Sequence, residues 1–159
     1  MAANCRLAPY VIRKLEDEHE LRLTDIIPME TGHEFIEADI SDLDAVMRAA
    51  EGIDAIINLS VLRPERQLAW HVNTLGCYSM MRAAVAHGIK RVTNTGPHFT
   101  VEVAPHQYWD YNIGFDVPLK SSTHLYAISK SAGQEICRLF TEQHNVYVMC
   151  YLFFSFSQT

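Results

Sequence analysis

The chain has 159 residues, 48% of them hydrophobic and 20% charged, which is the composition of one globular domain. Its net charge of −6 and its lack of a basic run argue against nucleic acid as a partner. No apolar run reaches the roughly 20 residues of a membrane span, and the N-terminal residues do not resemble a secretory signal. The four cysteines are widely spaced, which predicts reduced thiols in a cytoplasmic protein rather than a disulfide framework or a zinc site.

Helical and strand patterns alternate along the chain. Helices are expected over 8–19, 41–52, 65–87 and 125–144, and strands over 20–25, 34–38, 54–59, 91–95 and 146–154. Ser41 is the expected N-cap of the second helix, and Gly88 the left-handed residue that closes the third. The apolar strands look buried on both sides, which predicts a doubly wound parallel α/β sheet of the Rossmann type. The irregular stretch 96–124 is long enough to be functional, as a cover over a substrate.

The last predicted helix carries a tyrosine and a lysine four residues apart, in Tyr126-Ala-Ile-Ser-Lys130. Residues at this spacing share a helix face. A lysine there can stabilise the phenolate and lower the pKa of Tyr126 from its ordinary value, so that the phenol can act as a general acid–base. On spacing alone, an ordinary surface or half-buried pair is the more common interpretation.

Four polar residues outside this helix are further candidates. Asp25 ends a strand at the carboxyl edge, where it can accept hydrogen bonds from an adenosine ribose and repel a 2′-phosphate, favouring NAD over NADP. Asp39 follows the next strand and could hold an adenine edge. Asn73 lies in a helix interior, which is unfavourable unless its amide is used. Thr95 ends a strand, where its hydroxyl could polarise a substrate carbonyl. Taken alone, Asp25 could equally be a strand-end turn residue. Asp39 would more often be a turn or cap residue, Asn73 a solvent-exposed one and Thr95 an ordinary loop threonine.

Taken together, these segments resemble the extended short-chain dehydrogenase/reductase family, in its NAD-dependent epimerase/dehydratase branch. The segments that carry the resemblance, in the family's order, are Leu21-Arg-Leu-Thr-Asp25, Glu37-Ala-Asp39, Asp54-Ala-Ile-Ile-Asn58-Leu59, Asn73-Thr-Leu-Gly76, His87-Gly-Ile-Lys-Arg-Val92 and Tyr126-Ala-Ile-Ser-Lys130. Uronate-dehydrogenase-like members look most similar. The resemblance covers nearly the whole chain.

The resemblance implies a role for each candidate. Tyr126 would be the acid–base, with Lys130 holding the nicotinamide ribose and Thr95 orienting the substrate oxygen. The residues implied around the cofactor are Asp25 and Ile26 at the adenosine ribose, Asp39 and Ile40 at the adenine, Asn58, Leu59 and Ser60 beneath the cofactor, and Asn73 as a support for the lysine through water. The substrate would be a sugar or a sugar nucleotide.

The chain also departs from the family's pattern. Ala2 and Cys5 stand where the first two glycines of the phosphate-binding turn belong, with Ala8 at the third position. The strand that precedes this turn, normally the centre of the sheet, has no counterpart, and neither has the substrate-binding region after the last strand. Thr95-Gly96-Pro97 replaces the usual serine-containing pair. We therefore expect a truncated Rossmann-type domain over 1–159, with exposed edges on both neighbours of the absent strand.

Three readings remain open at this point. The first is an NAD-dependent oxidoreductase or epimerase that uses Tyr126, Lys130 and Thr95. The second is a catalytically silent fragment or interaction module that keeps the fold. The third is a homodimer in which another chain completes the sheet.

Overall fold

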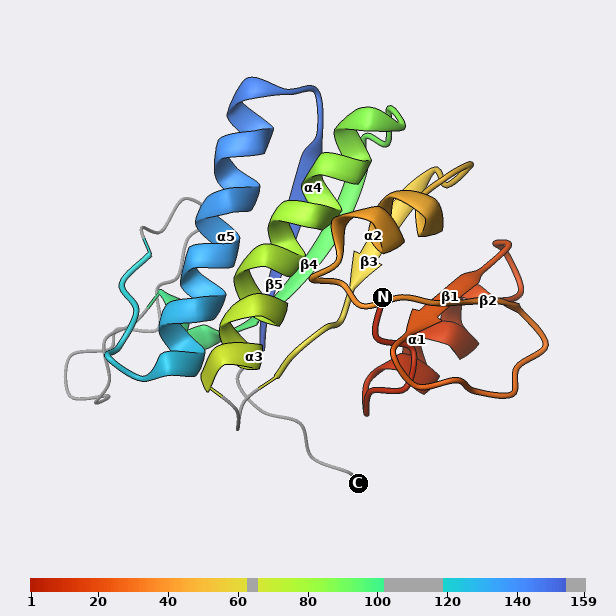
Figure 1. Ribbon diagram of the computed structural model, residues 1–159, viewed down its shortest axis with the longest axis horizontal. Helices are drawn as coiled ribbons and strands as arrows, with labels where there is room; N and C mark the ends of the chain where they lie inside the picture. Colours follow the sequence, from red (N-terminus) through yellow and green to blue (C-terminus); the bar gives the residue numbers. More distant parts are fainter. Residues whose placement is uncertain (63–65, 102–118, 154–159) are drawn as a thin grey trace.

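The computed structural model describes residues 1–62, 66–101 and 119–153 and contains two parallel sheets (Figure 1). The strands are β1 (Arg22–Asp25) and β2 (Glu34–Glu37) in one sheet, and β3 (Ala55–Asn58), β4 (Arg91–Pro97) and β5 (Tyr147–Phe153) in the other. Every pairing is parallel. The predicted alternation of parallel strands with helices is confirmed.

The helices fall close to their predicted places, with two differences. They are α1 (Ala8–Leu15), α2 (Leu43–Ala49), α3 (Arg66–Trp70), a π-helical segment (His71–Leu75), α4 (Gly76–Ala86), a short 3₁₀ turn (His98–Thr100) and α5 (Leu125–Gln143). The predicted long helix over 65–87 is present as an unbroken helical run from Arg66 to Ala86, but the π turn between α3 and α4 was not predicted. The prediction of Ser41 as N-cap is wrong, since the carboxylate of Asp42 accepts the N–H groups of Asp44 and Ala45. Gly88 has φ +70° and follows α4 as predicted.

Helices α2, α4 and α5 pack side by side over one face of the β3–β4–β5 sheet (Figure 1). Their apolar side chains form the core with β3 and β4, centred on Met80 and Met81, which are fully buried. On β5, by contrast, three alternate side chains remain in solvent: Tyr147, Met149 and Tyr151 are 67%, 57% and 50% exposed. The prediction of a last strand buried on both sides is therefore wrong, because an apolar run does not reveal whether both faces of a strand are covered.

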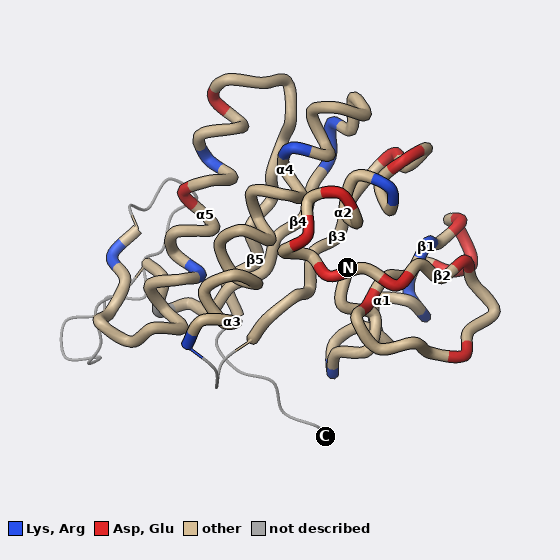
Figure 2. Tube along the Cα trace, viewed as in Figure 1, with Lys and Arg blue, Asp and Glu red and all other residues tan. Residues whose placement is uncertain are grey.

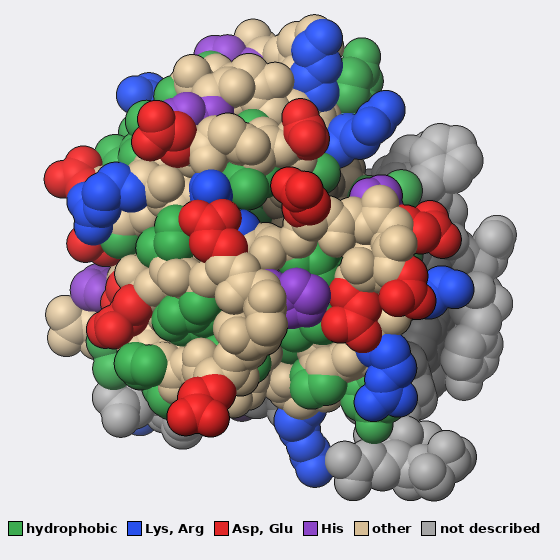
Figure 3. Space-filling model, turned by 90° about the vertical axis from the view of Figure 1, so that its right-hand side faces the viewer, with side chains coloured by type: hydrophobic (Ala, Val, Ile, Leu, Met, Phe, Trp, Pro, Cys, Tyr) green, Lys and Arg blue, Asp and Glu red, His purple; other side chains and the backbone are tan. Residues whose placement is uncertain are grey.

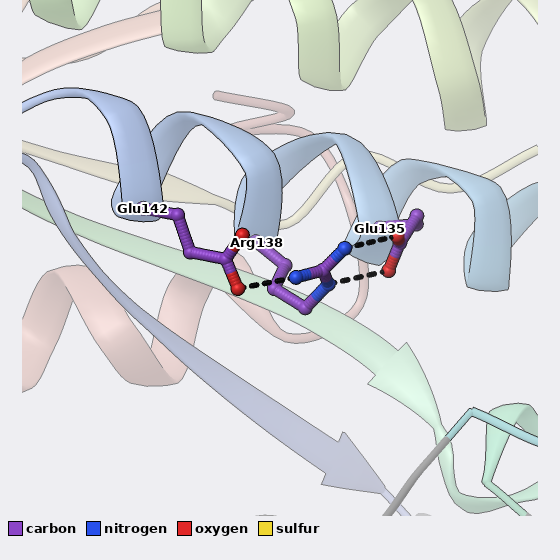
Figure 4. A network of polar contacts seen from close by, with 3 residues as sticks. All are labelled: Glu135, Arg138 and Glu142. Carbon is purple, nitrogen blue, oxygen red and sulfur yellow. Dashed lines mark hydrogen bonds and ion pairs between the residues drawn. The ribbon is translucent and has the colours of Figure 1, made fainter.

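The exposed face of α5 carries a small charge network (Figure 4). Arg138 binds both carboxylate oxygens of Glu135, at 2.8 and 2.6 Å, and also contacts Glu142. The hydrogen bonds from Arg138 lower the pKa of Glu135. Among the helices of the described ranges, none combines the length and apolarity needed to cross a membrane.

The N-terminal tripeptide joins the two sheets. The N–H of Ala3 donates to the carbonyl of Thr24 in β1 at 2.9 Å. On the other side, the Met1 ammonium donates to the carbonyl of Ile57 at 2.7 Å, and Leu59 donates to the carbonyl of Met1 at 3.1 Å. Met1 therefore lies between β1 and β3, which are not paired with each other (Figure 1). Among the described residues, Met1 and Ala3 bridge β1 and β3 near the carboxyl ends of both strands.

Candidate active site

Helix α5 brings Tyr126 and Lys130 to one buried face. The helix begins after His124, whose ring Nδ1 accepts the N–H of Tyr126 at 3.3 Å. Tyr126 is 8% exposed and Lys130 only 1%. The Nζ of Lys130 donates to the carbonyls of Ser60 at 2.7 Å and Thr95 at 3.0 Å, and burial lowers the pKa of Lys130. The amino group thus lies where the carboxyl ends of β3 and β4 meet, so the interpretation of a surface pair is wrong.

Thr95 reaches the same place from β4. Its hydroxyl donates to the carbonyl of Asn58 at 3.0 Å, across the β3–β4 pairing. A hydroxyl has one proton to donate and two lone pairs to accept with. Thr95 can therefore accept a further hydrogen bond here, but it can donate one only by releasing Asn58.

A pair of buried asparagines holds the ends of β3 and β4 together. Asn58 donates from Nδ2 to Oδ1 of Asn94 at 2.9 Å, and its own Oδ1 accepts the N–H of Ser60 at 3.0 Å. This second bond shapes the turn that presents the Ser60 carbonyl to Lys130. Asn94 is fully buried and was not among the predicted residues. Asparagine is depleted in strands, so its place inside an apolar strand was the available signal.

Asn73 lies in the π-helical segment and supports the base of α5. Its Nδ2 donates at 3.0 Å both to the carbonyl of Leu62 and to Oγ of Ser129, the neighbour of Lys130. Asn73 is 1% exposed, so the alternative of a surface asparagine is wrong. The close approach of the two helices requires Gly133, where a Cβ would lie 2.2 Å from the carbonyl oxygen of Asn73. Single π turns often occur at functional sites, but no residue type in 71–75 predicts this one.

Two cysteines that are distant in the sequence meet beneath Lys130. Asn94 directs its Nδ2 at the sulfurs of Cys77 and Cys137, at 3.7 and 3.9 Å. The hydrogen bond between the two thiols, together with burial, raises the pKa of Cys137. One turn beyond Lys130, the buried Nε2 of Gln134 has no hydrogen-bond partner within the part of the chain that the structure describes. The two thiols and this amide line the inner side of the site.

The carboxyl end of β1 forms a second group of candidate residues. Asp25 accepts the N–H of Asn4 at 2.9 Å and that of Ile27 at 3.1 Å. Ile26 follows it and is 60% exposed. In the turn that leads to α1, Ala2 has φ +63°, a conformation that glycine adopts far more easily. The turn thus keeps, at Ala2, the backbone shape of a position where the family has glycine.

The two residues expected at the adenine lie in different surroundings. The exposed carboxylate of Asp39 accepts the N–H and the hydroxyl of Ser41, both at 2.8 Å. Ile40 is 7% exposed and packs in the core, where a Cβ on Gly76 would come within 2.9 Å of it. Only the backbone of Ile40 can therefore face a ligand. Leu59, likewise buried, uses its N–H to bind Met1.

Two clusters of predicted residues result. Tyr126, Lys130, Thr95, Asn58, Ser60 and Asn73 gather between α5 and the ends of β3 and β4, whereas Asp25, Ile26 and Asp39 lie at the ends of β1 and β2. The hydrogen bond from the N–H of Leu59 to the carbonyl of Met1 lies between the two clusters. Within residues 1–62, 66–101 and 119–153, no group of His, Cys, Asp or Glu side chains could hold a metal ion.

Known proteins of one family resemble this chain in sequence. The sequence profile of the "NAD dependent epimerase/dehydratase family" matches residues 4–157. A uronate dehydrogenase of Pseudomonas syringae pv. tomato is 30% identical over 137 residues, which are 80% of this chain and 47% of the relative. An NAD-dependent glucose-6-phosphate dehydrogenase of Haloferax volcanii is 25% identical over 92% of this chain and 63% of its own length.

Solved structures show the same likeness. A mutated uronate dehydrogenase superposes with a TM-score of 0.80 at 27% identity, over 94% of this chain and 55% of that one. The uronate dehydrogenase of Agrobacterium tumefaciens gives 0.81 at 25% identity, over 92% and 56%. The chain spans about half the length of the uronate dehydrogenases that it matches. With the profile match extending over nearly its whole length, the chain belongs to the NAD-dependent epimerase/dehydratase family.

Proposed function

We propose that this chain supplies the cofactor-binding and proton-transferring part of an NAD-dependent dehydrogenase or epimerase that acts on a sugar or sugar nucleotide, with uronates as the first candidates. The observation that carries the proposal is the buried Lys130, one helical turn from Tyr126, at the joined ends of β3 and β4. Burying an amino group is costly unless it is used, and functional sites are where such perturbed groups gather.

Each side chain has a definite task in this proposal. Tyr126 exchanges the proton of the substrate hydroxyl. A lysine ammonium has three N–H donors, and Ser60 and Thr95 take two, which leaves the third of Lys130 for a ribose hydroxyl. Thr95 accepts the hydrogen bond of a substrate hydroxyl, since its own proton is held by Asn58. This arrangement suits oxidation of an alcohol, and bound NAD would supply the hydride acceptor.

The residues at the end of β1 fit the adenosine part of NAD. Asp25 offers a partly exposed carboxylate at the strand end, where ligands of open α/β sheets bind. Residues 1–54 hold 13 of the 19 acidic residues and only five of the 13 basic ones, and Figure 2 shows acidic positions along the trace around β1, β2 and α2. This negative charge would oppose a 2′-phosphate and favour NAD over NADP.

A catalytically silent fragment is the second candidate, and one observation favours it. Ala2 holds a left-handed conformation that is costly for any residue with a Cβ, which weakens the turn that would receive the phosphates. A homodimer that completes the sheet remains a third proposal.

One pair of experiments separates the first two candidates. Calorimetry should show NAD binding to the chain, and turnover of a uronate should fall about 10²- to 10⁴-fold in Tyr126→Phe with NAD binding unchanged. Tyr147→Phe, at an exposed tyrosine of β5, is the matched control and should keep full turnover. If NAD does not bind at all, the silent-fragment reading replaces this proposal. If NAD binds and Tyr126→Phe turns over normally, the assigned acid–base is wrong.

A further inference from the structure

A series of buried hydrogen bonds leads from the middle of the β3–β4–β5 sheet to Lys130. Oδ1 of Asn94 in β4 accepts from Nδ2 of Asn58 in β3 at 2.9 Å, and Oδ1 of Asn58 accepts the N–H of Ser60 at 3.0 Å. The carbonyl of Ser60 in turn accepts from Nζ of Lys130 at 2.7 Å. Asn94 is the innermost member of this series, and it has no task in the reaction proposed above.

The orientation of the Asn94 amide is set on its inner side. An asparagine amide carries donors at Nδ2 and an acceptor at Oδ1, so it can meet a neighbour in either of two orientations. Nδ2 of Asn94 lies 3.7 and 3.9 Å from the sulfurs of Cys77 and Cys137, which are weak acceptors. Oδ1 of Asn94 is then left to face Asn58. The orientation of Asn94 therefore determines that of Asn58.

A reversed Asn94 amide would break every later bond of the series. Its Nδ2 would oppose Nδ2 of Asn58, and Asn58 could avoid this only by turning its own Nδ2 toward the N–H of Ser60. Two donors repel each other, and a buried polar group without a partner is costly. The turn at Ser60 would lose the acceptor of its N–H, and its carbonyl would no longer be held toward Lys130.

Two carbonyls fix the ammonium of Lys130. Charged side chains on the face seen in Figure 3 lie at the surface, whereas Lys130 is buried. Within the described ranges, its Nζ donates to the carbonyls of Ser60 and Thr95, at 2.7 and 3.0 Å. Two acceptors on one tetrahedral nitrogen define the direction of its third N–H. Without Ser60, the ammonium could rotate about its one remaining bond to Thr95.

We propose that Asn94 is a positioning residue for Lys130, acting through Asn58 and the Ser60 carbonyl to direct the third N–H of the ammonium toward the cofactor ribose. Asn94 is fully buried and acts only through its neighbours. The inference rests on the proposed function in its last step, the contact with the cofactor. The positioning of Lys130 itself can be measured without any cofactor.

The titration of Lys130 tests the positioning directly. The chain has four lysines, so labelling them with ¹³C at Cε gives few NMR signals, and Lys130→Arg identifies the signal of Lys130. In Asn94→Leu the ammonium loses the Ser60 acceptor, and hydrogen bonds to charged groups are the stronger ones. We expect the pKa of Lys130 to fall, with proton binding weakened about tenfold. Ser79→Ala removes a buried hydroxyl of α4 outside the series and should leave this titration unchanged.

A second substitution separates positioning from a general loss of packing. If Asn94 acts through Asn58, Asn58→Leu should lower the pKa of Lys130 at least as much, and adding Asn94→Leu to it should change nothing further. Additive effects in the double variant, or an unchanged titration in Asn94→Leu, would overturn the proposal. Should Asn94→Leu fail to fold, Asn94→Thr answers the same question, because its hydroxyl ends one bond short of Oδ1. The titratable groups that act on Lys130 are the same in all these variants: Tyr126 and the thiols of Cys77, Cys137 and Cys150.

Calorimetry with NAD distinguishes a failure of this inference from a failure of the proposed function. We expect Asn94→Leu to weaken NAD binding about tenfold, through the misdirected third N–H of Lys130, and Ser79→Ala to keep it. If the unaltered chain does not bind NAD, the proposed function fails and the cofactor step fails with it, whereas the titration still decides the positioning. If Asn94→Leu shifts the titration but binds NAD as the unaltered chain does, the third N–H does not meet the cofactor and that step is overturned.

Discussion

The two sheets of this molecule are stabilised in different ways. The β3–β4–β5 sheet lies under α2, α4 and α5, and these helices with β3 and β4 contribute most of the buried core. The β1–β2 sheet contributes few fully buried residues and is attached mainly by hydrogen bonds: those of Met1 and Ala3, and those of Arg22 with the carbonyls of Ala49 and Glu51. The residues proposed for proton transfer thus lie on the well-packed half, and those proposed for the adenosine on the weakly attached half.

The largest expected effect tests the packing of the first half. In Gly133→Ala, the new Cβ would lie 2.2 Å from the carbonyl oxygen of Asn73 and 2.8 Å from the sulfur of Cys77, so α5 must move. We expect a loss of about 3 kcal/mol in the free energy of unfolding, measured by urea denaturation. Gly32→Ala, in the other half, is the matched control, because a Cβ there meets nothing within 4 Å. Equal stability of the two variants would contradict this packing.

A second prediction tests the attachment of the β1–β2 half through Met1. Burial lowers the pKa of the Met1 amino group from 8.0 to about 6. Between these values the unfolded chain binds the proton and the folded chain does not, so the free energy of unfolding rises with pH in this window, by up to about 3 kcal/mol. Below about pH 6 the group is charged in both states, and its burial then penalises the folded one.

N-terminal acetylation supplies the control for Met1. The acetylated protein keeps an N–H for Ile57 but has no titrating amine, so this part of the pH dependence should disappear. The histidines are the same in both proteins, which isolates the amine. Identical pH profiles of stability would show that the Met1 amino group is not buried in solution.

A smaller effect is expected at the start of α2. Asp42→Ala removes the acceptor of the Asp44 and Ala45 N–H groups and should cost about 1 kcal/mol. Ser41→Ala should cost less, since the Ser41 hydroxyl only contacts Asp39. Thermal unfolding of both variants gives the comparison, and a larger loss for Ser41→Ala would restore that residue as the cap.

The smallest effect is expected on the exposed face of α5. Arg138→Ala removes both ion pairs of the network, but exposed pairs contribute little to stability. We expect no change in Tm beyond the reproducibility of calorimetry, at low and at high salt. A clear, salt-dependent loss would mean that this surface supports the well-packed half.

The sequence predicted the elements that have a strong local signal. The order of the strands, the long α5 helix and the left-handed Gly88 follow from apolar periodicity and turn chemistry, and the structure has them. The shared helix face of Tyr126 and Lys130 followed from their spacing, whereas the burial of Lys130 did not. The Asn58–Asn94 pair, the Cys77–Cys137 contact and the π turn did not, because they depend on which segments meet in three dimensions.

The exposed side of β5 was missed for a related reason. Tyr147, Met149 and Tyr151 are apolar like the rest of the strand, and composition does not tell which face a helix covers. The predicted N-cap, Ser41, lies one residue before the observed cap, Asp42, which is the usual uncertainty of a helix boundary.

The π-helical segment has a consequence for how this chain can vary. An α-helix turns by about 100° per residue, so the residue that the π turn accommodates sets the rotation of α3 relative to α4. Removing one residue from His71–Leu75 would give a more regular helix, yet it would carry Asn73 away from Ser129 and Leu62. A substitution in this segment changes the contacts of one side chain. A change in its length would rotate α3 relative to α4 and so alter all the contacts made by residues on its N-terminal side. The site depends on the length of this segment more than on the identity of its residues.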